Sequence, residues 1–224
     1  MGTLFIRAGG GVDGTVYPAS VLSATWDARL VWRLRTTTGI VGTPNKTPAA
    51  NEADLPAGWS KDGTILYLTN NFTMDLWDFT GWQVDCYGAY TQNFTNSLFT
   101  GSGLQQMLTV GDYIAGGNVS VTHCNVNGTG HTGAYQALIG TAASTTINIY
   151  DTHFYNAPYN YLTPVGNSNM ARNYFENFGV GAVGGAHVEA IQVRQVTHVW
   201  SQILIDQTQC GSSTASTVTG ALHI

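Results

Sequence analysis

Residues 147–156 read INIYDTHFYN, and a ten-residue unit of this pattern recurs along the chain. The six copies begin at Phe72, Gln92, Val119, Ile147, Ser168 and Ile203. Their third positions are Met74, Phe94, Val121, Ile149, Met170 and Ile205, and their eighth positions are Phe79, Phe99, Val126, Phe154, Phe175 and Cys210. Apolar residues at alternating positions turn one face of a strand inward, so each unit is predicted to be a strand segment with its apolar side on a core.

The tenth position supplies turn residues. It holds Gly81, Gly101, Gly128, Asn156, Asn177 and Ser212, and glycine and asparagine tolerate a left-handed backbone. A second set of segments, residues 135–138, 159–162, 188–191 and 220–222, aligns in successive copies and predicts a second sheet. Because one copy cannot bury its apolar face alone, stacking must supply the core. The sequence therefore predicts an all-β, right-handed parallel β-helix solenoid.

Composition agrees with this fold and excludes several functions. Only 9% of the 224 residues are charged, against about 25% in ordinary globular proteins. Stacked like charges about 4.8 Å apart would repel one another along a solenoid. A net charge of −5 with 8 Lys and Arg argues against nucleic-acid binding. No run of 18 apolar residues is present, which argues against membrane insertion.

The N-terminal part has a different pattern. We expect residues 1–63 to contain a strand at 3–7, a capping helix and an irregular loop, and residues 64–224 to form the coils of one domain. The helix is predicted from Ser20 to about Leu34, with Leu22, Trp26 and Leu30 on one face, lying across the first coil. A loop as long as 36–63 is expected to be functional or to pack on the side of the solenoid.

The two chain ends raise the questions of export and assembly. The N-terminus has no basic segment and no long apolar segment of a signal peptide, so a complete chain would not be exported by the usual route. Residues 220–224 stop midway through a coil without a C-terminal cap. Because an exposed strand edge invites association, we expect a longer protein or a homo-oligomer, for which a trimer is one arrangement.

The chain resembles the pectate-lyase-like superfamily of right-handed β-helices. The resemblance rests on the glycine turn at 10–14, residues 24–28 of the expected helix and the coils, and residues 187–192 resemble a His-x-Asp/Glu-x-x-Gln segment of bacterial and phage β-helix proteins. Members include pectate and alginate lyases, polygalacturonase-type hydrolases and phage tailspikes. The resemblance implies the fold more strongly than an activity.

The fifth position provides the candidate catalytic group. It holds Leu76, Asn96, His123, Asp151, Arg172 and Gln207. His123, Asp151 and Arg172 would stand on three neighbouring coils, where an acid, a base and a cation could bind a uronic acid and transfer a proton. Alternatively, Asp151 only neutralises Arg172 in a solvated ladder.

Two further groups are candidate substrate-binding residues. His153 and Tyr174 lie in the outward seventh column, with Asp78, Leu98, Asn125 and Gln209. In the second predicted sheet, Glu189 would stack with Gln136 and Asn160, and His187 and Gln192 belong to the same strand. This group could bind sugar hydroxyls or form an internal polar ladder that maintains the strand register.

No cofactor or metal site is predicted. Calcium, common in lyases of the resembled superfamily, needs several clustered oxygen ligands, and Asp75, Asp78 and Asp85 are the nearest group. The paired carboxylates of a hydrolase are not apparent. The cysteines, Cys86, Cys124 and Cys210, have the spacing of neither a disulfide framework nor a zinc site, so we expect free, mostly buried thiols.

Three functions remain open. The first is a phage virion surface protein, such as a tail spike, fibre or capsid-surface component, that binds host or environmental glycans and contacts other virion subunits. The second is a lyase or glycoside hydrolase acting on acidic polysaccharide. The third is a structural module of a cell-surface adhesin. The first places the protein on the virion, and the others place it outside the cell or on its surface.

Overall fold

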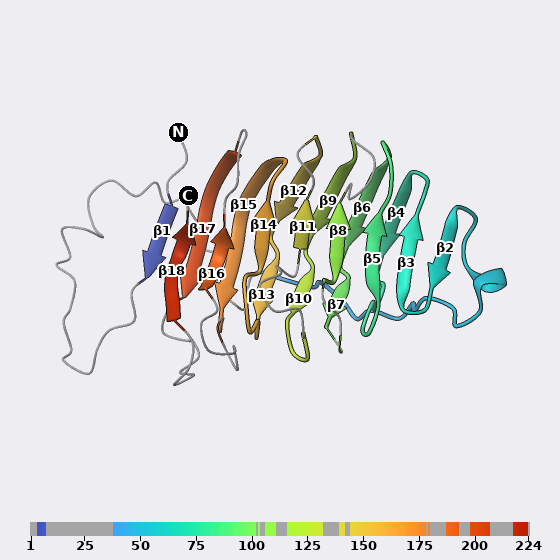
Figure 1. Cartoon of the computed structure of the whole chain (residues 1–224), viewed down its shortest axis with the longest axis horizontal. Helices are drawn as coiled ribbons and strands as arrows, with labels where there is room; N and C mark the ends of the chain where they lie inside the picture. Colours follow the sequence, from blue (N-terminus) through green and yellow to red (C-terminus); the bar gives the residue numbers. More distant parts are fainter. Residues whose placement is uncertain are drawn as a thin grey trace.

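The computed structural model describes residues 4–7, 38–101, 103, 106–110, 116–131, 139–141, 144–177, 179, 187–192, 198–206 and 217–223. These residues form a parallel β-solenoid, seen as a long row of strands in Figure 1. Only one short helical segment occurs among them, the 3-10 turn Glu52–Asp54. The predicted all-β solenoid is confirmed, while residues 20–34 of the predicted capping helix lie outside the described part.

From the second to the fifth ten-residue unit, the chain bends at the fifth residue and a strand segment lies on either side of the bend. The first ladder contains β4 (Phe72–Asp75), β6 (Thr91–Thr95), β9 (Asn118–Thr122), β12 (Thr146–Tyr150) and the first halves of β15 (Asn167–Glu176) and β17 (His198–Asp206). The second ladder contains β7 (Leu98–Thr100), β10 (Asn125–Asn127), β13 (His153–Tyr155) and the second halves of β15 and β17. Both ladders belong to one ten-stranded sheet, and the described strands form two sheets, as predicted.

A third ladder closes the coil. It contains β3 (Ile65–Leu68), β5 (Gln83–Cys86), β8 (Leu108–Val110), β11 (Ile139–Thr141), β14 (Leu162–Pro164), β16 (His187–Gln192) and β18 (Thr217–His223). β3 begins one residue after the predicted start of the coils at residue 64. The predicted alignment of Leu162 with Ile191 is also confirmed. The fourth copy, predicted to begin at Gly220, is shifted by one residue, because Gly220 pairs with Glu189 and Leu222 with Ile191. The alignment of Leu138 with Leu162 is wrong by one residue, because Ile139 is the partner of Leu162.

The register of the first five copies is as predicted, and that of the sixth is wrong. Phe72, Gln92, Val119, Ile147 and Ser168 align in successive strands. The residue that aligns next is His198, five residues before the predicted Ile203. Trp200 therefore takes the third position and Ile205 the eighth, while Gln202, between paired neighbours, lies opposite Arg172. The predicted alignment was wrong because the second apolar run of β17, residues 203–205, resembles the first half of the unit.

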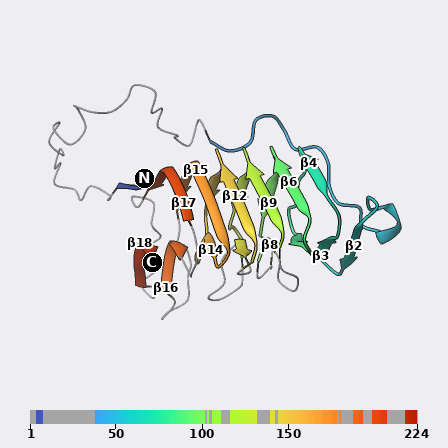
Figure 2. The ribbon, with the colours of Figure 1, turned by 90° about the horizontal axis from the view of Figure 1, so that it is seen from above.

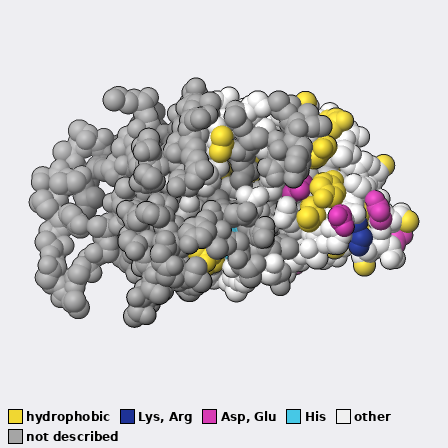
Figure 3. All heavy atoms as spheres, viewed as in Figure 1, with side chains coloured by type: hydrophobic (Ala, Val, Ile, Leu, Met, Phe, Trp, Pro, Cys, Tyr) yellow, Lys and Arg dark blue, Asp and Glu magenta, His cyan; other side chains and the backbone are white. Residues whose placement is uncertain are grey.

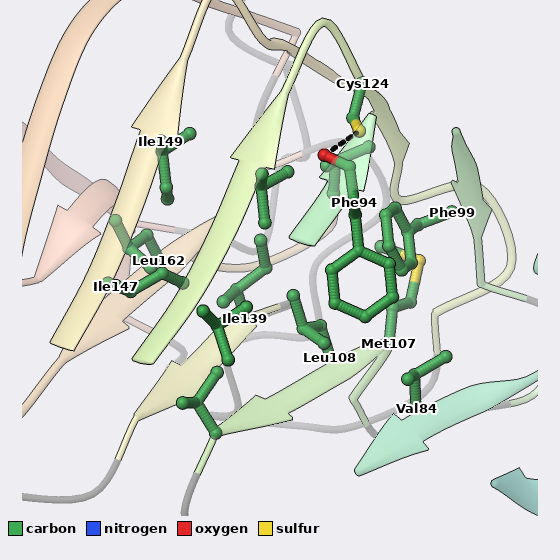
Figure 4. Packing of buried hydrophobic residues seen from close by; sticks show 14 of the residues in the cluster. Val84, Phe94, Phe99, Met107, Leu108, Cys124, Ile139, Ile147, Ile149 and Leu162 are labelled. Carbon is green, nitrogen blue, oxygen red and sulfur yellow. Dashed lines mark hydrogen bonds between the residues drawn. The ribbon is translucent and has the colours of Figure 1, made fainter. Parts of the chain in front are cut away.

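The core consists of the predicted third and eighth columns. Their described members, from Met74 to Met170 and from Phe79 to Phe175, are all buried. Phe79 stacks on Phe99 at 5.1 Å between ring centroids, and Phe154 stacks on Phe175 at 4.4 Å. Figure 4 shows Phe94, Phe99 and aliphatic residues of neighbouring coils meeting between the ladders. Stacking thus buries what a single coil would leave exposed.

Described strands cover part of each end of the solenoid. At the first coil, β2 (Trp59–Asp62) pairs antiparallel with β3, and the buried Trp59 ring packs 4.9 Å from the Trp77 ring. At the other end, β1 (Leu4–Arg7) pairs in parallel with residues 203–206 of β17. The expectation of an uncovered C-terminal end is therefore wrong for the second ladder. β18 pairs with β16 alone among the described strands.

Candidate functional site

The fifth residue of each unit forms a corner with a left-handed backbone. The five described corner residues have φ between 49° and 60°, and they are Leu76, Asn96, His123, Asp151 and Arg172. Their backbone amides keep the coils in register; for example, His123 N donates to Tyr150 O at 3.1 Å. A left-handed non-glycine residue costs about 1–2 kcal/mol, so stacking must hold the corner in place. The candidate catalytic residues are therefore also the residues that bend the chain.

Small polar side chains satisfy the amides just inside this corner. Thr152 N donates to Asn173 Oδ1 at 2.9 Å, and Trp77 N donates to Ser97 Oγ at 3.2 Å. The Cys124 thiol occupies the same column and donates to Phe94 O (Figure 4). Because buried amides need partners, the sixth position favours short side chains with an acceptor. Ser97, Thr152 and Asn173 fit this preference, whereas Trp77, at the same position of the first unit, does not.

An extended segment runs along the corner, and we call residues 39–46 the strap. Figure 2 shows this part of the chain following one side of the solenoid from near β15 toward β4. Gly39 N donates to Asp151 O at 2.7 Å, and Asn45 N donates to Leu76 O at 2.9 Å. Between them, the amides of Ile40 and Val41 donate to Asn125 Oδ1 and Asn96 Oδ1. The prediction that the long loop packs on the side of the solenoid is confirmed.

Asp151 and Arg172 form a two-pronged ion pair at the corner. Arg172 Nη2 lies 2.7 Å from Asp151 Oδ2, and Arg172 Nε lies 2.9 Å from Asp151 Oδ1. Hydrogen bonding to this carboxylate raises the pKa of the Arg172 guanidinium above its ordinary value. The Asp151 side chain is 6% exposed and that of Arg172 is 37% exposed. The ion pair considered as the alternative is therefore present, and a catalytic role of these residues stays a prediction.

His123 occupies the corner of the preceding coil, half-buried. Its Nδ1 is buried and has no hydrogen-bond partner among the described residues. The structure thus places His123, Asp151 and Arg172 on three consecutive coils, as predicted. With both carboxylate oxygens of Asp151 bound to Arg172, this group is better arranged for holding charge than for removing a proton.

His153 and Tyr174 belong to a buried polar cluster in the second ladder. His153 Nε2 lies 2.9 Å from Glu176 Oε1, and the Tyr174 hydroxyl donates to Glu176 Oε2 at 3.3 Å. The His153 ring also stacks on Tyr155 at 4.6 Å. Sequence reasoning missed Glu176. It is two residues after Tyr174, and alternate strand residues share a face, so the seventh column could have revealed it. The prediction that this column faces outward is wrong for His153 and Tyr174, which are only 6% and 7% exposed.

The remaining predicted binding residues are only partly described. Asn160 is buried before β14, and Tyr161 N donates to Ala190 O at 3.1 Å, consistent with the predicted alignment of Asn160 with Glu189. His187, Glu189 and Gln192 lie on β16, where the structure describes only their backbone. Gln136 lies outside the described residues. The role of this group stays a prediction.

The outward side of the first ladder carries amide and hydroxyl groups in columns, and we call it the polar face. Its members are Asn71, Thr73, Asp75, Thr91, Asn93, Thr95, Asn118, Ser120, Thr122, Thr146, Asn148, Tyr150, Asn167, Asn169 and Ala171. All of these are at least partly exposed, and Asp75 is the one charged member. Asn169 Nδ2 donates to Asn148 Oδ1, and Asn148 Nδ2 donates to Asn118 Oδ1, each at 2.8 Å.

Charge and metal-binding groups are sparse in the described structure. Figure 3 shows few charged side chains on the described part of one surface, gathered toward the end that carries β2. Asp75, Asp78 and Asp85 do not form a cluster, and no three His, Cys, Asp or Glu side chains gather as metal ligands within the described ranges. No described helix is long and apolar enough to cross a membrane.

The thiols of Cys86 and Cys124 are free and buried, as predicted, whereas Cys210 lies outside the described residues. Burial raises the pKa of Cys124 to about 12 and that of Cys86 well above its ordinary value. Because the thiolate is the reactive form, these two cysteines are structural rather than catalytic in character. Neither of them belongs to the polar face.

Comparison with known proteins adds no relative, since no protein-family model, curated protein or solved structure matches this chain.

Proposed function

We propose that this protein is a phage virion surface component, such as a tail spike, fibre or capsid-surface protein, that recognises a host or environmental glycan. The observation that carries the proposal is the polar face. Its amides and hydroxyls are repeated on successive coils about 4.8 Å apart, and a sugar chain offers hydroxyls at a similar repeat. A stacked backbone holds these groups in place before the ligand arrives, which lowers the entropic cost of binding.

The finer assignment of the fold belongs to the same proposal. Parallel strands joined within one sheet are right-handed in about 98% of cases, which supports a right-handed β-helix. Membership of the pectate-lyase-like superfamily is proposed on the sequence resemblance and on the parallel coils. Assembly with other virion subunits, as a homo-oligomer such as a trimer, is proposed because strands at a solenoid end present edges that favour pairing.

A polysaccharide-cleaving enzyme is the second candidate. It is favoured by the buried, unpartnered Nδ1 of His123 on the coil next to the Asp151–Arg172 pair. A guanidinium that is partly exposed could bind a uronate carboxylate, and the histidine could accept a proton. This reading would place the protein outside the cell or on its surface.

One experiment separates the two candidates. We expect the purified protein to bind at least one member of a panel of bacterial surface and uronate-containing polysaccharides, without producing unsaturated ends or new reducing ends. Binding is measured by affinity electrophoresis. Cleavage that disappears in both Asp151→Asn and Arg172→Ala would instead establish the enzyme. If neither binding nor cleavage is observed across the panel, both candidates are wrong.

A further inference from the structure

An open hollow of about 340 Å³ lies at the first-coil end of the polar face. It is lined by Asn71, Phe72, Thr73, Thr91 and Asn93. These residues come from neighbouring strands, with Phe72 opposite Gln92 and Thr73 opposite Asn93. The volume is at the lower end of the range of about 300–1,000 Å³ found for small-molecule pockets.

The polar groups of this hollow have unused hydrogen-bonding capacity, unlike the bonded asparagine column of the later coils. The side chains of Thr73, Thr91 and Asn93 make no hydrogen bond within the described part of the protein. Asn71 uses its Oδ1 to accept the Thr91 amide at 2.8 Å, and its amide nitrogen has no described partner. By contrast, Asn118, Asn148 and Asn169 bond to one another. A ligand in the hollow would not have to break protein hydrogen bonds.

Phe72 gives the hollow an apolar surface whose position is set by its neighbours. Its ring meets the Trp59 ring edge-on, with centroids 5.7 Å apart and planes at 85°. Gly58 leaves space beside it, since a Cβ there would lie 3.2 Å from Phe72 Cζ. Amides and hydroxyls around a fixed aromatic ring match a sugar, which has hydroxyls at its rim and apolar C–H groups on its faces.

The charges in and around the hollow bear on whether a neutral sugar or a uronate would bind there. None of its five lining residues is charged. The nearest charge on the same side of β4 is the carboxylate of Asp75, two residues beyond Thr73. Hydrogen bonds from Asn96 and Thr95 lower the pKa of Asp75, and Lys46, whose Nζ donates to Asp75 O at 2.9 Å, offsets part of its charge. Since none of the lining residues is a cation that could pair with a uronate, a neutral sugar avoids the cost of burying an unpaired charge.

We infer that this hollow is the principal sugar-binding subsite and that it takes a neutral sugar unit of the glycan. The inference rests on the proposed glycan recognition and deepens it. It places the main contact at the first coils, away from the His123–Asp151–Arg172 corner that an acidic polysaccharide would use.

The test measures binding by isothermal titration calorimetry. The probes are neutral oligosaccharides of glucose, galactose and mannose, with oligogalacturonate of the same length as the acidic counterpart. We expect a neutral probe to bind, and Asn93→Ala to weaken that binding about tenfold, because one hydrogen-bonding side chain is lost. Phe72→Leu, which keeps an apolar side chain, is expected to weaken binding by a similar factor.

The control is Asn51→Ala, which removes the same side chain from an exposed position beside the 3-10 turn, outside the polar face, and should change affinity less than about twofold. Unchanged affinity in Asn93→Ala, an equal loss in Asn51→Ala, or binding of oligogalacturonate alone would overturn the subsite and leave glycan recognition standing. If no oligosaccharide and no polysaccharide of the panel binds, the proposed function and the subsite both fail.

Discussion

At the scale of single residues, most corner positions combine a left-handed backbone with a side chain larger than those that usually adopt this conformation. A left-handed backbone favours glycine or asparagine, yet Leu76, His123, Asp151 and Arg172 occupy it. The strained residues are held by backbone hydrogen bonds between coils and by the strap, which accounts for their position without a catalytic role. Strain at such residues motivates a search for function but does not establish it.

Asp75 gives a residue-scale prediction about pH. Side-chain hydrogen bonds from Asn96 and Thr95, together with the charge of Lys46, lower its pKa in the folded protein below the ordinary 3.8. A carboxyl with a depressed folded pKa stabilises the protein above its unfolded pKa, and this contribution is lost as the pH falls through the folded pKa. We therefore expect Asp75→Asn to lower Tm near neutral pH and to have a smaller effect in acid.

The measurement compares thermal unfolding of the parent and of Asp75→Asn at about pH 6 and about pH 2. Asp78→Asn serves as the control, since Asp78 also accepts a local backbone hydrogen bond, from Thr80 N, but has no bond to Asn96 or Thr95. A Tm difference for Asp75→Asn that is equally large at both pH values would contradict the prediction.

At the scale of elements, the strap is the part of the structure that the repeat pattern could not place. It has no periodic apolar residues, and its amides donate to oxygens of three corner residues and to Asn125 Oδ1, on different coils. Its attachment depends on close approach, because a Cβ at Gly39 would lie 2.2 Å from Asn125 Oδ1 and 3.2 Å from His153 Cβ.

Gly39→Ala is therefore expected to loosen the strap. Gly39 has φ of +87°, so alanine adds backbone strain to the steric overlap, and we expect a loss of about 2–4 kcal/mol in the free energy of unfolding. The control is Gly63→Ala, where φ is +57° and no atom lies within 4 Å of the added Cβ, so backbone strain of about 1–2 kcal/mol remains alone.

Urea denaturation measures both variants, and limited proteolysis reports whether residues 39–46 become accessible. Equal destabilisation by the two substitutions, with no new cleavage in the strap, would show that the packing against Asn125 contributes nothing.

At the scale of the whole molecule, the solenoid brings the two ends of the chain together. β1 pairs with residues 203–206 of β17, so an N-terminal strand lies beside the last coils while β2 and Trp59 lie at the first (Figure 1). An uncovered parallel strand presents a row of unpaired backbone groups and favours association with another chain. β1 thus protects part of an edge.

Removing residues 1–7 should expose that edge. We expect the shortened protein to form larger species at a given concentration than the full chain, as measured by multi-angle light scattering. A protein lacking only residues 1–3, which precede β1, is the control and should behave like the full chain. Identical molar masses for all three proteins would contradict a protective role of β1.

Much of the fold could be predicted from the sequence because its signal is local and repeated. Alternating apolar residues identified the third and eighth columns, and the tenth position has a left-handed backbone at Gly81, Asn156 and Asn177 but not at Gly101 and Gly128. The sixth copy was misaligned because β17 contains two apolar runs five residues apart, and local pattern alone cannot choose between them. The pairing of β17 with β15 decides the register.

Only part of the candidate site could be predicted from the sequence. The sequence by itself determined that His123, Asp151 and Arg172 stack on consecutive coils, since stacking follows from the repeat. Only the tertiary structure decided that Asp151 is bound by Arg172, that the strap covers the corner, and that Glu176 joins His153 and Tyr174. Each of these depends on contacts between segments far apart in the chain, and a local sequence pattern does not show which distant side chains meet.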